Sequence, residues 1–309
     1  MDKYFLSTHS GPQEEISEKE FNKFIEAKKI ISSIHELEEN FDLLATSYFE
    51  LEKEISEILL KSMIYKEVGY GQFIYSRLSV NLKLATFLTS ARMYKDQSRG
   101  NVKKILHTQL FNEKNDIIFE FNLLELMRNE LQHSNLIVNP AGHGWKILPQ
   151  DENSNNYNIN DPKTYTTEHT INLVMSLDSL KNNNHKVTKS FIEKNPSLPD
   201  TICLLKSIRI YMDNYMDIHM KFRDHLESKV KNAENLLINT RKHYEKSNPE
   251  CKLHSLAVYK EEDQFVHKNK YWLLMDWINE RKKLATKNTM NKLEGSYITS
   301  KPKKSEPKG

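Results

Sequence analysis

The feature that most constrains this chain is a run of almost fifty residues in which apolar side chains recur every three or four positions. The run extends from Ser17 to about Met63. Because an α-helix has 3.6 residues per turn, this spacing places the apolar side chains on one face. It predicts either one long helix or two helices broken near Asn40. The apolar positions are Phe21, Phe24, Ile31, Ile34, Phe41, Leu44, Tyr48, Leu51, Ile55 and Ile58.

Two more helices are predicted before residue 140. One runs from about Gln72 to Asp96, after a break marked by Gly69 and Gly71, and is followed by a connector at 98–101. Its apolar stripe consists of Leu78, Leu82, Ala85 and Leu88. The next predicted helix covers about 115–134 and ends before a stretch that contains proline and glycine.

The second half of the chain begins with a change in composition and in the spacing of apolar residues. Short β-branched or aromatic segments at 145–148 and 170–177 flank an Asn-rich loop and predict a small antiparallel hairpin. Helical spacing returns from about Asp200 to Lys246, and a last helix is predicted from about Asn269 to Thr286. The expected fold is therefore mainly α, a helical bundle with a small β-hairpin insertion and further C-terminal helices.

We divide the chain into a helical bundle at 1–140, an accessory region packed on it at 141–290, and a disordered basic tail at 291–309. The tail ends in KPKKSEPKG, which cannot bury a core. The formal net charge of +3 is small for 309 residues. It argues against a protein that coats nucleic acid by charge alone, but it leaves room for a local basic groove.

The expected location is the cytoplasm. The N-terminus lacks the basic start and apolar run of a signal peptide, and no apolar stretch approaches the roughly 20 residues that span a bilayer. The two cysteines, Cys203 and Cys251, form no pairing pattern, which fits a reducing compartment.

Near the end of the third predicted helix, Arg128, Asn129 and His133 form the motif Arg-Asn-x-x-x-His. In this motif and its helical setting the chain resembles the HEPN superfamily, whose nucleases carry an arginine followed four to six residues later by a histidine. The segment 81–96 also looks like the helix that precedes the motif in small HEPN toxins. The resemblance covers roughly residues 17–140. It implies a metal-independent endoribonuclease whose products end in 2′,3′-cyclic phosphate.

The residue types suit that reaction, in which the 2′-hydroxyl of RNA attacks the adjacent phosphate. Histidine titrates near pH 6.5, so His133 is suited to move the proton as a general base or acid. The planar, permanently charged guanidinium of Arg128 matches phosphate oxygens and stabilises developing charge. Asn129 is assigned a supporting role, either orienting His133 or donating a hydrogen bond to the phosphate.

The spacing of the motif limits how one chain can use it. On an ideal helix, Arg128 and His133 point about 140° apart, because each residue turns the helix by about 100°. One straight helix cannot aim both side chains at one phosphate. The resemblance implies the usual arrangement, in which two HEPN units pack about a two-fold axis and their motifs converge. The chain holds one motif, so a homodimer is expected.

Less specific interpretations of the same residues stay open. Arg128 lies on the apolar seam, where it would serve as a buried partner of Glu125 or another acid. His133, near a helix C-terminus, would favour the helix dipole without any catalytic role.

The functional hypotheses differ accordingly. The first is a ribonuclease that acts on RNA as a toxin or in abortive-infection defence against viruses, with an antitoxin or regulatory partner. The second is a catalytically inactive HEPN scaffold that binds RNA or a partner, and the third is a helical partner-binding protein. No metal-binding spacing and no phosphate-binding glycine loop occur, so no metal and no cofactor are expected.

Overall fold

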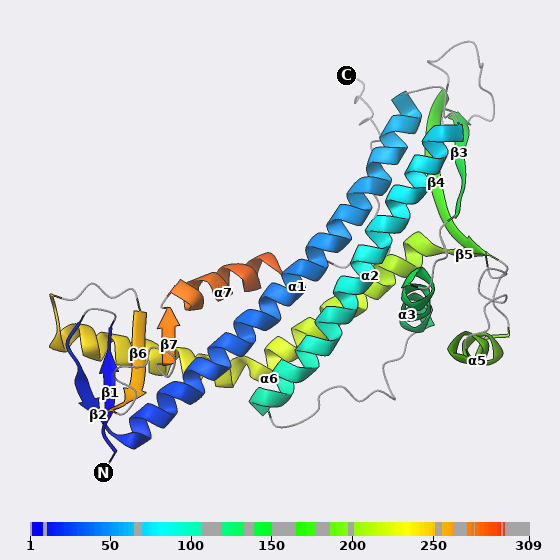
Figure 1. The fold of residues 1–309 in the computed structure, drawn as a ribbon. Helices are drawn as coiled ribbons and strands as arrows, with labels where there is room; N and C mark the ends of the chain where they lie inside the picture. The colour runs from blue at the N-terminus through cyan, green and yellow to red at the C-terminus, as the bar shows by residue number, and fades with distance from the viewer. Residues whose placement is uncertain are drawn as a thin grey trace, which may run out of the picture.

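Three long helices run side by side and form the body of the protein in the computed structural model (Figure 1). They are α1 (Glu18–Ile64), α2 (Tyr70–Leu106) and α6 (Leu204–Ser247). The described part of the chain is mainly helical, which confirms the predicted fold class. The structure describes residues 2–8, 11–64, 70–106, 119–132, 139–149, 165–176, 186–196, 201–250, 255–261, 271–274, 276–291 and 293.

Helix α1 is a single helix of 47 residues, so no break occurs at Asn40. At 1.5 Å per residue it is about 70 Å long. A capping box starts it: the backbone N–H of Ser17 donates to Glu20 Oε2 at 2.9 Å, and the N–H of Glu20 donates to Ser17 Oγ at 3.3 Å. All ten apolar positions of the predicted stripe are buried, which confirms the periodicity from which the helix was predicted.

Helix α2 differs from its prediction in length and in orientation. It continues through 98–101, so the predicted connector is wrong. Ser98 is buried and its hydroxyl donates to the carbonyl of Lys95, which satisfies it within the helix, while one interior glycine costs only about 1 kcal/mol. The residues of the predicted apolar stripe also differ in exposure: Leu88 is buried, but Leu78 and Leu82 are exposed. The buried face consists of Val80, Leu84, Phe87, Leu88, Ala91 and Tyr94.

Two small antiparallel sheets lie at opposite ends of the long helices (Figure 1). One contains β3 (Asn139–Pro149), β4 (Tyr165–Ser176) and β5 (Thr201–Cys203), and its β3–β4 pair confirms the predicted hairpin. The other sheet was not predicted. Its order is β2-β1-β6-β7, built from β1 (Tyr4–Ser7), β2 (Glu14–Ile16), β6 (Ser255–Lys260) and β7 (Tyr271–Leu274).

Three shorter helices complete the described fold. Helix α3 (Phe119–Gln132) packs against α2 and α6, while α5 (Lys186–Lys194) contacts α3. Helix α7 (Asp276–Lys287) packs against α1. The predicted last helix was to begin near residue 269, which is wrong because β7 precedes α7. Trp272 and Leu273 pair with β6 as strand residues.

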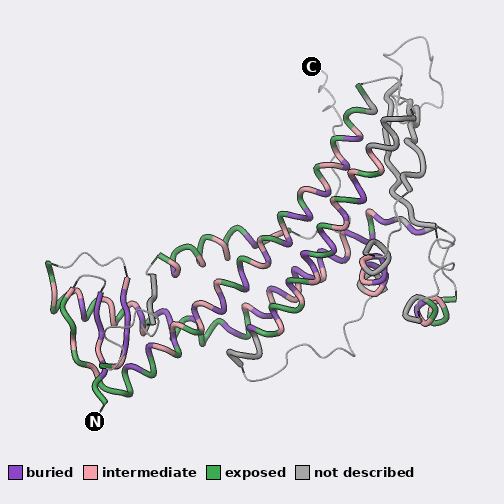
Figure 2. The backbone as a smooth tube through the Cα atoms, viewed as in Figure 1, coloured by how far each residue is buried: buried purple, intermediate pink, exposed green. Residues whose placement is uncertain are grey.

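A continuous apolar core lies along the contacts between the long helices, where the buried segments face one another (Figure 2). It includes residues on both sides of position 140, from Tyr4 to Ile278. The domain boundary near 140 stays a prediction, and residues 294–309 of the predicted tail lie outside the described residues. Within the described ranges, no helix is both long enough and apolar enough to cross a membrane.

Candidate functional site

Helix α3 carries Arg128 and Asn129 of the predicted site and is held in place by three fully buried side chains, Leu123, Leu124 and Met127. Arg128 follows directly and is half-buried, at the edge of this apolar contact. One helical turn earlier, Glu125 accepts hydrogen bonds from Arg92 Nη1 on α2 at 3.4 Å and from the Tyr211 hydroxyl on α6 at 3.2 Å. Arg128 therefore extends from a helix that is fixed to both neighbours.

The structure gives less for the other two motif residues. Asn129 lies within α3, but its side chain is not among those that the structure describes. His133 lies outside the described residues. Whether the three side chains converge on one point therefore stays a prediction.

The side of α2 that faces α3 carries three basic residues, of which Arg92 is paired with Asp96 at 2.8 Å and with Glu125 at 3.4 Å. Arg92, Lys95 and Arg99 are all half-buried and recur at spacings of three and four residues, which places them on one helix face. Burial lowers the pKa of Lys95, and the charges of Arg99 and Arg92 lower it further, against the opposing effect of Glu125 and Asp96. A cationic row thus lies beside the helix that carries Arg128.

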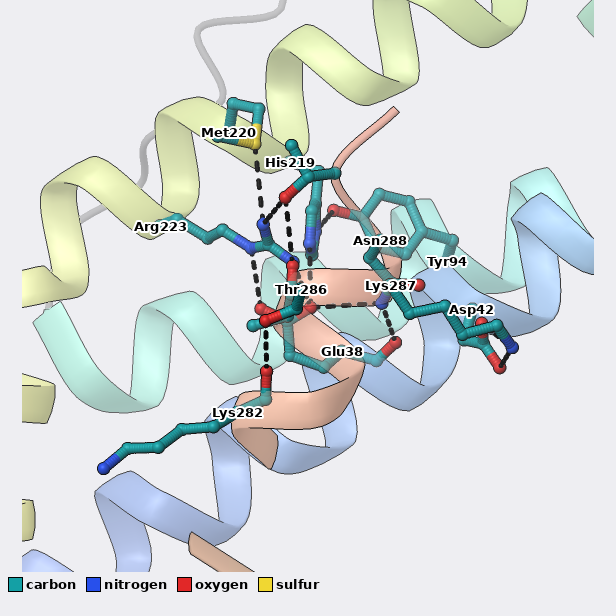
Figure 3. A network of polar contacts seen from close by, with 12 residues as sticks. Glu38, Asp42, Tyr94, His219, Met220, Arg223, Lys282, Thr286, Lys287 and Asn288 are labelled. Atoms are coloured by element: carbon teal, nitrogen blue, oxygen red, sulfur yellow. Dashed lines mark hydrogen bonds and ion pairs between the residues drawn. The ribbon is translucent and has the colours of Figure 1, made fainter. Parts of the chain in front are cut away.

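A different polar group lies deep between α1 and α6, and we call it the Glu38 cluster: Glu38, Tyr94, His219, Arg223 and Asn288 (Figure 3). Glu38 is 1% exposed. Its two carboxylate oxygens accept from Arg223 Nε at 2.8 Å and Nη2 at 2.6 Å, from His219 Nε2 at 3.2 Å and from Asn288 Nδ2 at 3.1 Å. The ring of His219 also stacks on Phe41, with centroids 4.0 Å apart.

Protonation in this cluster follows from its contacts. Burial alone would raise the pKa of Glu38, but hydrogen bonds from His219 and Arg223 lower it to about 2. Burial lowers the pKa of His219, which favours the neutral ring in spite of Glu38. A neutral ring with its proton on Nε2 donates to Glu38 and accepts the Tyr94 hydroxyl at Nδ1, 2.9 Å away. The Glu38 carboxylate therefore finds its hydrogen-bond donors inside the protein, and its role is structural.

No sequence pattern connects Glu38 with His219, because the two are 181 positions apart. One local feature indicates the cluster: His219 and Arg223 lie four residues apart, at apolar positions of a periodic helix. Polar side chains at such positions require a buried acid as partner. The described residues hold no group of three or more histidine, cysteine, aspartate or glutamate side chains suited to a metal ion.

Comparison with known proteins adds no assignment to this geometry. No family model, no curated protein and no solved structure matches the chain.

Proposed function

We propose that this protein is a metal-independent endoribonuclease of the HEPN type that acts as a homodimer. The observation that supports it best is the position of Arg128: half-buried on a fixed helix and beside the α2 face that carries Arg92, Lys95 and Arg99. RNA is a polyanion, and a cationic surface next to the motif attracts its phosphates. The motif itself and the HEPN resemblance supply the assignment to cleavage.

In the proposed reaction the 2′-hydroxyl of RNA attacks the adjacent phosphorus, and the 5′-oxygen of the next nucleotide leaves. His133 removes the proton from the 2′-hydroxyl or donates one to the leaving oxygen. Arg128 stabilises the negative charge on the phosphate oxygens, with Asn129 in support. The products are a 2′,3′-cyclic phosphate and a free 5′-hydroxyl, and no redox step or metal is required.

The homodimer has a candidate surface on the outer face of α2. Leu78, Leu82 and Met93 are exposed there, with Leu82 at 67%. They recur at helical spacing, and Met93 directly follows Arg92, so the apolar stripe lies about 100° round the helix from the cationic row. A second copy seated on this stripe would bury it and bring the two motif helices near each other. The proposed role as a toxin or abortive-infection effector, with an antitoxin or regulatory partner, rests on the resemblance.

Incubation of purified protein with total RNA in EDTA tests the proposal. We expect the wild type to cleave, and His133→Ala to lose roughly 10²–10⁴-fold of the rate. Arg128→Ala should lose roughly 10²–10³-fold. His225→Ala, an exposed histidine on α6, is the matched control and should keep full activity. Products should carry cyclic phosphate ends, which phosphatase leaves intact until acid opens the ring.

Light scattering on the same samples tests the dimer. Wild type and His133→Ala should have twice the mass of the chain, whereas Leu82→Glu should be monomeric and inactive. Dimers without cleavage in any variant would favour the inactive scaffold. Equal cleavage by wild type, His133→Ala and Arg128→Ala would rule out this site.

A further inference from the structure

Helix α7 lies along α1 and is held there mainly by polar contacts (Figure 1). Ile278 is the one side chain of this helix that is buried. Lys287 Nζ lies 2.7 Å from Asp42 of α1, and Arg281 pairs with Glu234 of α6. Elements with few buried apolar contacts open most readily, and exposed ion pairs add little stability. The docking of α7 is therefore weaker than that of the long helices.

One contact in this interface joins two aromatic rings. The indole of Trp277 on α7 stacks on the imidazole of His35 on α1, with the ring centroids 5.8 Å apart and the planes at 16°. His35 Nε2 also lies 3.3 Å from Glu39 Oε1, one helical turn further along α1. The imidazole is thus in contact with an indole face and a carboxylate, and both attract a cation.

The same interface contains three buried polar atoms without a hydrogen-bond partner: His35 Nδ1, Ser32 Oγ and Arg281 Nε. Ser32 precedes His35 by three residues, and Arg281 follows Trp277 by four. Residues at these spacings share a helix face, so the three atoms lie on the faces that carry the stacked rings. A buried polar atom without a partner opposes the contact that buries it, because it loses its hydrogen bonds to water. The docked position of α7 is therefore only marginally favourable.

Protonation of His35 would remove one of these costs. A neutral imidazole has a single N–H, so one of its two nitrogens cannot donate. The protonated ring donates through both, and the Ser32 hydroxyl is suited to accept from Nδ1. The charge also strengthens the contact with Trp277, because indole is the aromatic ring that binds cations best. That last gain exists only while α7 is docked.

The charged groups around the two rings are mostly acidic, and most are already paired. They lie three or four residues after a ring or directly before Trp277: Glu38, Glu39, Asp276, Glu280 and Arg281. Arg281 is the one cation among them, and its charge is paired with Glu234. Glu38 and Glu280 are paired with Arg223 and Lys283. Glu39 and the exposed Asp276 therefore remain to interact with a charge on His35.

The residues that directly follow α7 contact the Glu38 cluster or belong to it. Asn288 is 1% exposed and donates to the backbone carbonyl of Glu38 at 2.9 Å as well as to its carboxylate. Arg223 Nη1 donates to Thr289 Oγ1 at 3.3 Å. Release of α7 would strain both contacts, so the position of this helix is coupled to the core.

We infer that His35 and Trp277 form a pH-sensitive latch, in which protonation of His35 holds α7 more firmly on α1 and loss of the proton favours release. The two equilibria are linked: if protonation favours docking, docking favours protonation to the same extent. The inference concerns how the C-terminal helix is held, and it does not depend on the proposed ribonuclease activity.

Hydrogen exchange of the full-length protein tests the inference, measured by mass spectrometry at about pH 8 and about pH 5.5 and corrected for the intrinsic rate at each pH. We expect α7 amides to be less protected than α6 amides at the higher pH. Their protection should rise about two- to fivefold at the lower pH. His35→Gln removes the titrating ring and Trp277→Leu removes the indole, and neither should show that rise. His225→Gln, an exposed change on α6, is the matched control and should behave as wild type.

The other results would overturn the inference. Equal protection of α7 and α6 at both pH values would mean that α7 opens only when the whole protein unfolds. The same rise in wild type and His35→Gln would exclude His35 as the group that responds, and a fall in α7 protection in acid would reverse the sign. Circular dichroism verifies the fold of each variant, and if one of the two fails to fold, the other decides.

Discussion

Two neighbouring carboxylates on one turn of α1 have opposite environments. Glu38 points toward α6 and accepts four hydrogen bonds, from His219, Arg223 and Asn288, whereas Glu36, two residues earlier, is exposed and has no described partner. Residues two apart on a helix point about 160° from each other, so one turn serves two interfaces. The buried carboxylate stabilises the fold, while the exposed one faces solvent.

The largest expected effect tests the paired side. Glu38→Ala removes the acid and leaves Arg223 and His219 without it inside the core, so we expect a loss of about 3–5 kcal/mol in the free energy of unfolding. Glu36→Ala, on the same turn, should change stability by less than about 0.5 kcal/mol. Urea denaturation measures both. Similar losses for the two variants would contradict the contrast between the two faces.

The next effect is the response of the same cluster to acid. Burial holds the pKa of His219 below its ordinary value, so the unfolded chain binds a proton there that the folded chain resists. Stability is complete above about pH 6.5 and falls below it, by up to about 1.4 kcal/mol per pH unit. Glu38, with a pKa of about 2, is protonated on unfolding only below about pH 4.5, and its stabilisation is lost from there downward.

His219→Gln isolates the histidine. Although less stable at pH 7, this variant should lose less further stability than wild type between pH 6.5 and 5. His225→Gln, an exposed change on the same helix, should follow the wild-type curve. Thermal unfolding at a series of pH values measures the slopes, and parallel curves for wild type and His219→Gln would contradict the assignment.

How well each region could be predicted depends on how far apart in sequence its interacting residues lie. Local periodicity was enough to predict α1, α6 and the β3–β4 hairpin, because each forms within one segment of the chain. It could not find the Glu38 cluster, in which Asn288 reaches Glu38 across 250 positions. Nor could it find β1, whose four residues are too short for a pattern and pair with β6 near the other end of the chain.

Helix α2 shows a second reason why sequence reasoning was incomplete. Its apolar residues lie on more than one face, so periodicity could not tell the core face from the outer one. Leu82 and Leu84 are two residues apart, and only Leu84 is buried. Of the candidate site, the sequence supplied Arg128, Asn129 and His133. The cationic row beside them emerged from the packing of α2 against α3.

A smaller effect is expected at a buried amide of α2. The side chain of Asn81 donates to the carbonyl of Arg77 at 2.8 Å. Asn81→Leu removes this hydrogen bond, so the free energy of unfolding should fall by about 1 kcal/mol. Gln97→Leu, at an exposed position of the same helix, is the control and should change it by less than about 0.5 kcal/mol. Urea denaturation measures both variants, and equal losses would contradict this role of the Asn81 amide.

The smallest expected effect comes from a comparison of an open and a packed position on α2. Gly100→Ala adds a methyl group where no atom lies within 4 Å and improves helix propensity, so the free energy of unfolding should rise by about 0.4–1 kcal/mol. Ala91 lies on the buried face of the same helix. Ala91→Val should instead cost about 1–3 kcal/mol, because the core there is full. The two changes add comparable bulk to one helix, so opposite signs in urea denaturation would confirm that Gly100 faces open space and Ala91 the core, whereas a loss in both would contradict the open position of Gly100.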